Sequence, residues 1–226
     1  MKTSWSFEIR RRRQSVRGPS GVGGAGVVAP FEQRRSDDDD GTPAGALRRL
    51  LAGNRRFAQR RVWRPHRDRA RPDRMRPSPA PFAAILGCSD APVPPEVLFD
   101  HGSGALFVVQ VAGNVVTPHE VASLEYAVAV LEVRAILVLG HTRCGAIEAA
   151  RAGTPVEGHV SALLRHVAAR LDAASTGCPH AEDNARAQRR RLLESSGVLT
   201  DRTASGTLIV TAAVHDIAAG SVRVVG

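Results

Sequence analysis

Residues 82–90 read Phe82-Ala-Ala-Ile-Leu-Gly-Cys-Ser-Asp90, a short apolar run that stops at a glycine and is followed at once by a thiol and a carboxylate. An uninterrupted apolar run of this length is typical of a strand that is buried on both faces of a parallel sheet. Similar runs occur at residues 105–111, 135–139 and 207–212. The sequence therefore predicts a central sheet built from these strands.

Helical patterns lie between the predicted strands, and we expect helices at residues 118–131, 145–152, 159–174 and 181–196. Strands that alternate with helices favour parallel strands joined by right-handed crossovers, so the predicted class is α/β, with a parallel central sheet flanked by helices. A chain of 226 residues with 43% hydrophobic composition is long enough for one substantial core. We therefore expect a single domain over residues 41–226.

An N-terminal helical arm is predicted at the start of this domain. From Thr42 onward apolar side chains recur at helical spacing, with arginines on the opposite side. Thr42 followed by Pro43 suits an N-cap and the first helical position. The next stretch, residues 63–81, is rich in proline and arginine and is expected to run as an extended connection over the surface.

The positive charge is concentrated in one part of the chain. The net charge is +9, and residues 41–78 hold twelve arginines against two aspartates. Clustered cations could bind nucleic acid or an acidic membrane surface, or they could form a solvated helix face or a subunit contact. No aromatic interleaving or nucleic-acid motif accompanies the arginines, and no apolar run reaches the roughly 20 residues that cross a bilayer. We therefore expect no nucleic-acid partner and no membrane partner.

Residues 1–40 do not have the pattern of a folded segment. They contain four consecutive arginines, Arg10–Arg13, a glycine-rich run at residues 18–29, and an acidic run, Asp37–Asp40. The favoured interpretation is a disordered tail on a cytoplasmic protein. The alternative is an export signal of the twin-arginine type, because basic residues followed by a weakly apolar segment are typical of such signals.

Metal-ligating side chains follow two of the predicted strands. Cys88 and Asp90 come after the first strand, and His141 and Cys144 come after the third. The carboxyl ends of parallel strands meet at one edge of a sheet, and cysteine, histidine and carboxylate are the ligands that Zn²⁺ prefers. The set therefore indicates a zinc site, although each residue alone would be ordinary. Cys178 is interpreted as a free thiol, and the remaining histidines as ordinary ones: His66, His101, His119, His159, His166, His180 and His215.

The fourth zinc ligand decides what this site can do. If water fills that position, zinc lowers the pKa of the water to ~7 and supplies hydroxide at neutral pH. If Asp90 fills it, the site is closed and the metal is structural. Both arrangements are open on these residues alone.

The sequence resembles the β-class carbonic anhydrases from about Thr42 to its C-terminus. The motifs that carry the resemblance are Cys88-Ser-Asp90, Val93-Pro-Pro-Glu96, Phe107-Val-Val, Ala112-Gly-Asn114, Ser123-Leu-Glu-Tyr-Ala127 and Gly140-His-Thr-Arg-Cys-Gly-Ala146. The resemblance implies a parallel-sheet α/β fold and a homodimer or larger homo-oligomer whose N-terminal helices wrap the partner.

The resemblance also implies a reaction and a role for each site residue. Cys88, His141 and Cys144 would hold Zn²⁺, and zinc-bound hydroxide would convert CO2 reversibly to bicarbonate. Asp90 would be the catalytic carboxylate that orients the hydroxide, provided that another group holds it away from the metal.

One departure from the family pattern bears directly on Asp90. The family motif is Cys-x-Asp-x-Arg, and Pro92 stands in place of its arginine. Pro79 stands where the family has glutamine. Gln110 stands where the family often has arginine. A guanidinium fixes a carboxylate with two hydrogen bonds, whereas a proline side chain has no donor. Our hypothesis is therefore that Asp90 ligates zinc and that CO2 hydration is weak or absent.

Two other functions remain open for such a site. One is a non-catalytic, zinc-stabilised homologue that acts as a binding or assembly module. The other is a hydrolase for a CO2-like molecule such as carbonyl sulfide or carbon disulfide.

Overall fold

The computed structural model describes residues 40–62, 80–169 and 179–226. The predictions made for residues 1–39 and for most of the connection at 63–81 lie outside the described residues, as does the prediction for Cys178. All described residues except Asp40 fall within the range 41–226, for which a single domain is predicted.

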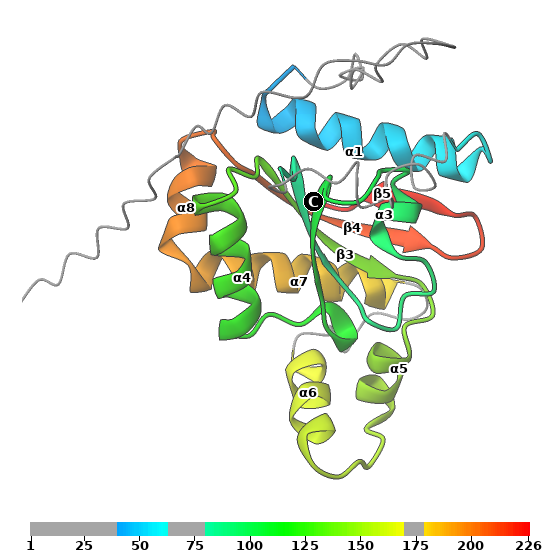
Figure 1. Cartoon of the computed structure of the whole chain (residues 1–226). Helices are drawn as coiled ribbons and strands as arrows, with labels where there is room; N and C mark the ends of the chain where they lie inside the picture. The colour runs from blue at the N-terminus through cyan, green and yellow to red at the C-terminus, as the bar shows by residue number, and fades with distance from the viewer. Residues whose placement is uncertain (1–39, 63–79, 170–178) are drawn as a thin grey trace, which may run out of the picture. The chain divides into compact units, whose positions relative to one another are not determined.

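A five-stranded sheet forms the centre of this domain, with strand order β2-β1-β3-β4-β5 (Figure 1). The pairs β1·β2, β1·β3 and β3·β4 are parallel, and β4·β5 is antiparallel. This arrangement confirms the predicted α/β class with a mainly parallel sheet. The strands are β1 Ala83–Gly87, β2 Leu106–Gln110, β3 Ala135–His141, β4 Ile209–Asp216 and β5 Ser221–Val224.

The fifth strand was not predicted from the sequence. β5 is only four residues long, and its burial pattern lacks the continuous apolar run of a central strand. It forms by turning back after Asp216, whose carboxylate accepts hydrogen bonds from the backbone N–H groups of Ala218 and Ala219. Strand β4 is correspondingly longer than predicted and extends to Asp216.

Helices cover both faces of the sheet, as Figure 1 shows. One face packs against α4, α7 and α8, which bury Leu124, Leu192 and Leu199 over Ile136 and Val138. The other face packs against α1 and α3. The helices are α1 Pro43–Ala58, α3 Pro95–Leu98, α4 Pro118–Ala129, α5 Gly145–Ala152, α6 His159–Ala168, α7 Pro179–Ser195 and α8 Gly197–Ala204, with a short 3₁₀ turn, η2, at Ala112–Asn114.

Helix α8 was also missed by the sequence prediction, which ended the preceding helix at Ser196. That residue has extended backbone dihedrals, and its hydroxyl accepts a hydrogen bond from the N–H of Leu199. Ser196 is therefore an N-cap that ends one helix and begins the next.

The predicted N-terminal helix is present and is fixed to the sheet by a buried amide. Asn54 on α1 donates to the carbonyls of Leu98 and Gly220 and accepts from the N–H of Val222. Gly53 permits this close approach, because a Cβ atom at that position would lie 1.7 Å from the carbonyl oxygen of Phe99. One face of α1 is thus part of the core.

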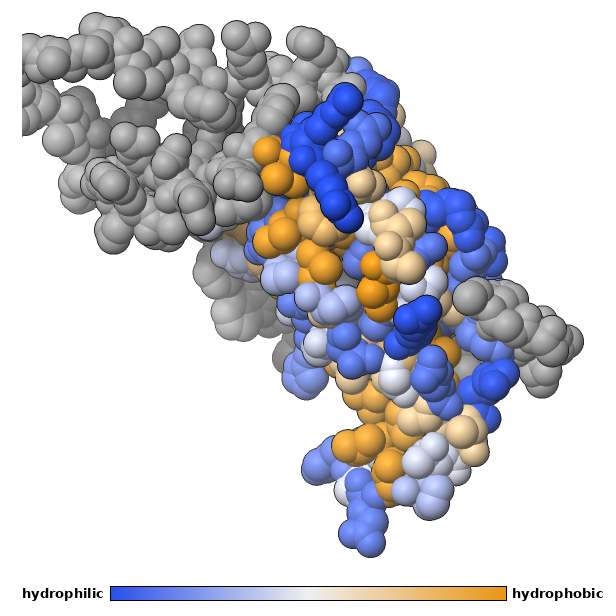
Figure 2. Space-filling model, turned by 90° about the vertical axis from the view of Figure 1, so that its right-hand side faces the viewer, coloured by the Kyte–Doolittle hydropathy of each residue, from blue (hydrophilic) through white to orange (hydrophobic). Residues whose placement is uncertain are grey.

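The opposite face of α1 carries exposed cations. Arg48 and Arg55 on α1 are exposed, as are Arg60 and Arg61 just after it, and Figure 2 shows strongly hydrophilic residues where the C-terminal end of α1 faces the viewer. For these four arginines, the placement agrees with the interpretation as a solvated face; the arginines at residues 64–76 lie outside the described residues. Within the described ranges, no helix has the length and apolar character needed to span a membrane.

Candidate metal centre

The sheet order brings two strand ends together at one edge. Strand β1 lies beside β3, with Gly87 in register with Leu139, so the residues that follow β1 lie close to the end of β3. Cys88 directly follows β1, His141 is the last residue of β3, and Cys144 is the N-cap of α5. A tight turn connects the last two, with Arg143 in the left-handed region at φ 58°.

Three of the four residues predicted from the sequence form one compact group. The ligand atoms of Cys88, His141 and Cys144 all lie within 4.8 Å of one another, and all three residues are buried. The two Sγ atoms are 3.7 Å apart. It is the one group of this kind in the described ranges. Asp90 does not belong to it.

The geometry of the group fits a zinc ion. Two thiolates that each lie about 2.3 Å from a tetrahedral zinc would place their sulfur atoms about 3.8 Å apart, close to the observed separation. Nδ1 of His141 lies 3.1 Å from the carbonyl oxygen of Thr142, so Nδ1–H donates and the Nε2 lone pair is left over. Nε2 is buried and has no hydrogen-bond partner among the residues described. A metal ion would satisfy it.

Backbone N–H groups surround both sulfur atoms. Cys88 Sγ accepts hydrogen bonds from the N–H of Asp90 at 3.3 Å and of Gly113 at 3.1 Å. The hydrogen bond with Cys88 and burial raise the pKa of Cys144, and the N–H groups of Ile147 and Ala146, in the first turn of α5, act against them by lowering it. These donors favour thiolates, which are the form that binds metal.

The two thiols share one proton when no metal is bound. A hydrogen bond from Cys144 lowers the pKa of Cys88 to about 4, and the same interaction with the Cys88 thiolate raises the pKa of Cys144. Burial lowers the pKa of His141, but the neighbouring Cys88 thiolate outweighs burial and raises it above its usual value. A metal ion must displace the proton that Cys144 holds.

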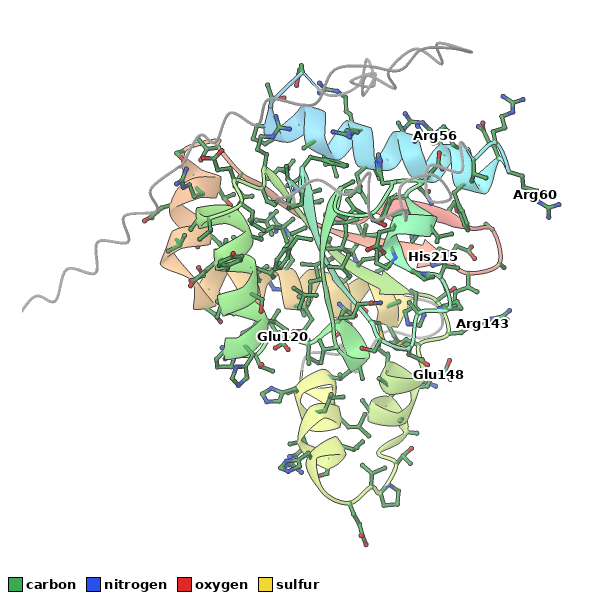
Figure 3. All side chains as sticks on the ribbon, in the orientation of Figure 1. Arg56, Arg60, Glu120, Arg143, Glu148 and His215 are labelled. Carbon is green, nitrogen blue, oxygen red and sulfur yellow. The ribbon has the colours of Figure 1, made fainter. Side chains whose placement is uncertain are left out.

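Asp90 is held by the backbone at the start of α5. Its Oδ2 atom accepts a hydrogen bond from the N–H of Gly145 at 2.7 Å. The ion pairs found within the described ranges do not include one between Asp90 and an arginine, and Figure 3 shows the Arg143 side chain extending outward from the end of β3. Pro92 is exposed. Among the described residues, Asp90 is therefore held by a main-chain N–H group.

A small pocket adjoins the metal ligands and contains two residues that had no role in the zinc prediction. Gln110 and His215 line it together with Cys88 and His141, and its other lining residues are apolar or glycine. His215 is 1% exposed and is paired in register with His141. Burial lowers the pKa of His215, and His141 lowers it further. The sequence signal was weak: a histidine near the end of an apolar strand, with no motif around it.

Comparison with known proteins identifies carbonic anhydrases as relatives of this chain. The family model described as carbonic anhydrase matches residues 83–222. Carbonic anhydrase 2 of Mycobacterium tuberculosis strain H37Rv is 33% identical over 184 residues, which cover 77% of this chain and 89% of that protein.

Two solved structures show the same fold. The β-carbonic anhydrase of Coccomyxa, in complex with acetazolamide, is 27% identical, with a TM-score of 0.58, covering 77% of this chain and 84% of that one. A tetrameric β-carbonic anhydrase of Sordaria macrospora is 25% identical, with a TM-score of 0.58, covering 66% of this chain and 82% of that one. With the family model matching more than half of its length, and a parallel sheet that brings two cysteines and a histidine together, the chain belongs to the β-class carbonic anhydrases.

Proposed function

We propose that this protein binds Zn²⁺ through Cys88, His141 and Cys144 and catalyses the reversible hydration of CO2 to bicarbonate. The observation that carries the proposal is the buried group of two sulfur atoms 3.7 Å apart beside an imidazole nitrogen without a partner in the described ranges. Zinc held there would act as a Lewis acid that lowers the pKa of a water molecule.

Asp90 orients the reacting water in this proposal, and Gly145 keeps the carboxylate in place. One carboxylate oxygen accepts the hydrogen bond from the N–H of Gly145, and the other has no hydrogen-bond partner among the described residues. The donor is the first residue of α5, where the positive end of the helix dipole also stabilises a negative charge. This arrangement supports an open fourth metal position, in contrast to our hypothesis that Asp90 ligates zinc.

CO2 hydration should be slower in this protein than it would be with an arginine at position 92. A guanidinium holds a carboxylate with two parallel hydrogen bonds, which fix both its distance and its orientation. The single N–H of Gly145 leaves the carboxylate freer to rotate.

The pocket suits a small substrate of low polarity. Ala91, Val93, Leu98 and Leu139 line it beside the metal ligands and offer no hydrogen bonds. An apolar lining accepts CO2 without the desolvation cost that a polar lining would impose.

Stopped-flow measurement of CO2 hydration across pH tests the proposal. Protein loaded with one equivalent of zinc should accelerate hydration, and the metal-free protein should not. Absence of turnover in fully loaded protein would contradict the proposal and favour the closed site with Asp90 as the fourth ligand. Turnover of carbonyl sulfide or carbon disulfide in its place would favour the hydrolase.

We further propose that the protein is a homo-oligomer. The Sordaria macrospora relative is described as tetrameric. Tyr126 on α4 is 51% exposed beside the edge strand β2, and Val130, which follows the helix, is 43% exposed. Light scattering after size-exclusion chromatography should give a mass at least twice that of the chain. A monomer at micromolar concentration would contradict this proposal.

A further inference from the structure

Two side-chain amides of α7 are completely buried next to the 3₁₀ turn η2. Asn184 is 0% exposed and Gln188 is 1% exposed, and the two residues lie one turn apart on the same helix. Asparagine and glutamine are mostly found at the surface, and they are buried only where their polar atoms find partners. The partners of these two amides therefore indicate what the residues do.

The two amides bind each other and the turn that contains η2. Nε2 of Gln188 donates to Oδ1 of Asn184 at 3.1 Å, and Oε1 of Gln188 accepts from the N–H of Val116 at 2.9 Å. Nδ2 of Asn184 donates to the carbonyl oxygen of Gly113 at 2.9 Å and to Oδ1 of Asn114 at 3.1 Å. Helix α7 thus holds this turn at three separate points.

The backbone of the turn needs such support. Gly113 and Asn114 both have positive φ angles, 69° and 43°. Position 113 accepts only glycine, because a Cβ atom there would also lie 2.9 Å from Cγ2 of Val167. A residue other than glycine at positive φ is strained and keeps that conformation only where its surroundings fix it. The hydrogen bonds from Asn184 are contacts of this kind.

The same turn donates a hydrogen bond to a metal ligand. The N–H of Gly113 donates to Sγ of Cys88 at 3.1 Å, while the carbonyl oxygen of Gly113 accepts from Asn184. Both backbone groups belong to one residue, so a displacement of Gly113 changes both hydrogen bonds. Asn184 therefore lies one residue away from the sulfur atom, without contacting it.

This hydrogen bond depends on tertiary structure more than the other one to the same sulfur does. The second donor to Cys88 Sγ is the N–H of Asp90, only two residues further along the chain, at 3.3 Å. Gly113 is 25 residues away in sequence and reaches the sulfur through the position of its turn. A hydrogen bond to a thiolate withdraws negative charge from the sulfur and tunes the metal that the sulfur holds.

We propose that Asn184 is a positioning residue for the metal centre. It fixes Gly113 so that the N–H of this glycine donates to the Cys88 thiolate and limits the charge that the sulfur gives to a bound metal ion. Gln188 holds the Asn184 amide in the required orientation. The inference rests on the metal-binding part of the proposed function, because it concerns the donor strength of one of the three ligands.

Replacement of Asn184 by leucine tests the inference, because leucine has a similar volume and no amide. The readout is the sulfur-to-metal charge-transfer absorption of the Co²⁺-substituted protein. Without the hydrogen bond from Gly113 the sulfur electrons lie at higher energy, so the band should move to longer wavelength. The dissociation constant for Co²⁺ should increase about tenfold or more, as is typical when an outer partner of a ligand is lost.

Asn54→Leu is the matched control for this substitution. Asn54 is also a buried asparagine that donates from a helix to backbone carbonyl oxygens, but it lies on α1 and holds Leu98 and Gly220. Both variants should unfold at a lower temperature than the wild-type protein, because each leaves buried backbone groups without a partner. The charge-transfer band should move in Asn184→Leu alone.

An unchanged band in Asn184→Leu would overturn the inference and leave Asn184 with a purely structural role. An equal shift in Asn54→Leu would overturn it as well. Should Asn184→Leu fail to fold, Gln188→Met carries the same measurement, because it removes the side chain that orients Asn184. This variant should shift the band in the same direction by a smaller amount, and an unchanged band would contradict the inference.

The outcomes also separate this inference from the proposed function. If the band moves in Asn184→Leu but the zinc-loaded wild-type protein does not hydrate CO2, the proposed reaction fails and this inference stands. If the wild-type protein hydrates CO2 and the band stays in place, the inference alone fails. A Co²⁺-loaded wild-type protein without a sulfur-to-metal band would contradict both, since Cys88 would then not bind the metal.

Discussion

The Oδ2 atom of Asp90 accepts a hydrogen bond of 2.7 Å from the backbone N–H of Gly145, the first residue of α5. This contact joins the loop after β1 to the helix that follows β3, and it lies beside both cysteines of the metal group. A carboxylate held at a helix N-terminus benefits from the exposed N–H groups and from the helix dipole. Asp90 thus has a donor although Pro92 provides none.

Replacing Gly145 with proline should lower CO2 hydration about tenfold or more, because it removes the N–H that holds Asp90. The backbone accepts this change: proline is favoured at the first helical position, and Cys144 before it has an extended conformation (φ −72°, ψ 115°). Stopped-flow kinetics and zinc content measured on the same preparation would check this result, and the zinc content should remain near one equivalent.

Gly145→Ala is the matched control for that change. It keeps the N–H, and its Cβ atom would lie 3.2 Å from Oδ2 of Asp90, a tight contact that a small shift can relieve. Activity close to that of wild type is expected. Equal losses in the alanine and proline variants would show that the space at Gly145 matters and its N–H does not.

Pro92→Arg should raise CO2 hydration, because a guanidinium can add two hydrogen bonds to the single one that Asp90 now accepts. Position 92 is exposed, so the longer side chain meets no core packing. The expected gain is about threefold to tenfold in kcat, measured at saturating CO2 with equal zinc content. Pro92→Lys, which has a cation without the planar fork, should gain less. Activity that appears only in Pro92→Arg would instead support the closed site.

Zinc affinity should increase with pH. With no metal bound, Cys88 is a thiolate above its pKa of about 4, while the raised pKa of Cys144 keeps a proton on that thiol. Zinc binding expels this proton, so between these two pKa values the dissociation constant should fall about tenfold per pH unit. Below the raised pKa of His141 a second proton is displaced and the dependence becomes steeper.

Calorimetry in buffers of different ionisation enthalpy would count the protons released on zinc binding. Cys144→Ala should release fewer protons and bind zinc at least about 100-fold more weakly, because one ligand is lost. A pH-independent zinc affinity would contradict the shared proton between Cys88 and Cys144.

Asn54→Leu should destabilise the fold by about 2–3 kcal/mol, because it leaves three backbone groups without their partner. These groups are the carbonyls of Leu98 and Gly220 and the N–H of Val222. Urea unfolding followed by circular dichroism would measure the loss. Arg55→Ala, at an exposed position on the same helix, should change stability by less than about 0.5 kcal/mol.

The elements that were predicted well are those whose pattern is local. Strand β1 and helix α5 were found nearly to the residue, because a continuous apolar run and a helical pattern each depend on a few neighbouring residues. Helix α8 and strand β5 were missed for the same reason, since Ser196 and the turn after Asp216 act through hydrogen bonds that composition does not reveal.

The sequence by itself determined the α/β class, the family, and the choice of Cys88, His141 and Cys144 as residues able to bind metal, because thiols and imidazoles keep their chemistry in any fold. The tertiary structure decided which groups surround them. Asp90 meets Gly145, 55 residues away, and His141 meets His215 only because β1, β3 and β4 are neighbours in the sheet. Such contacts arise from strand order and from backbone N–H groups that every residue except proline carries, so no motif records them.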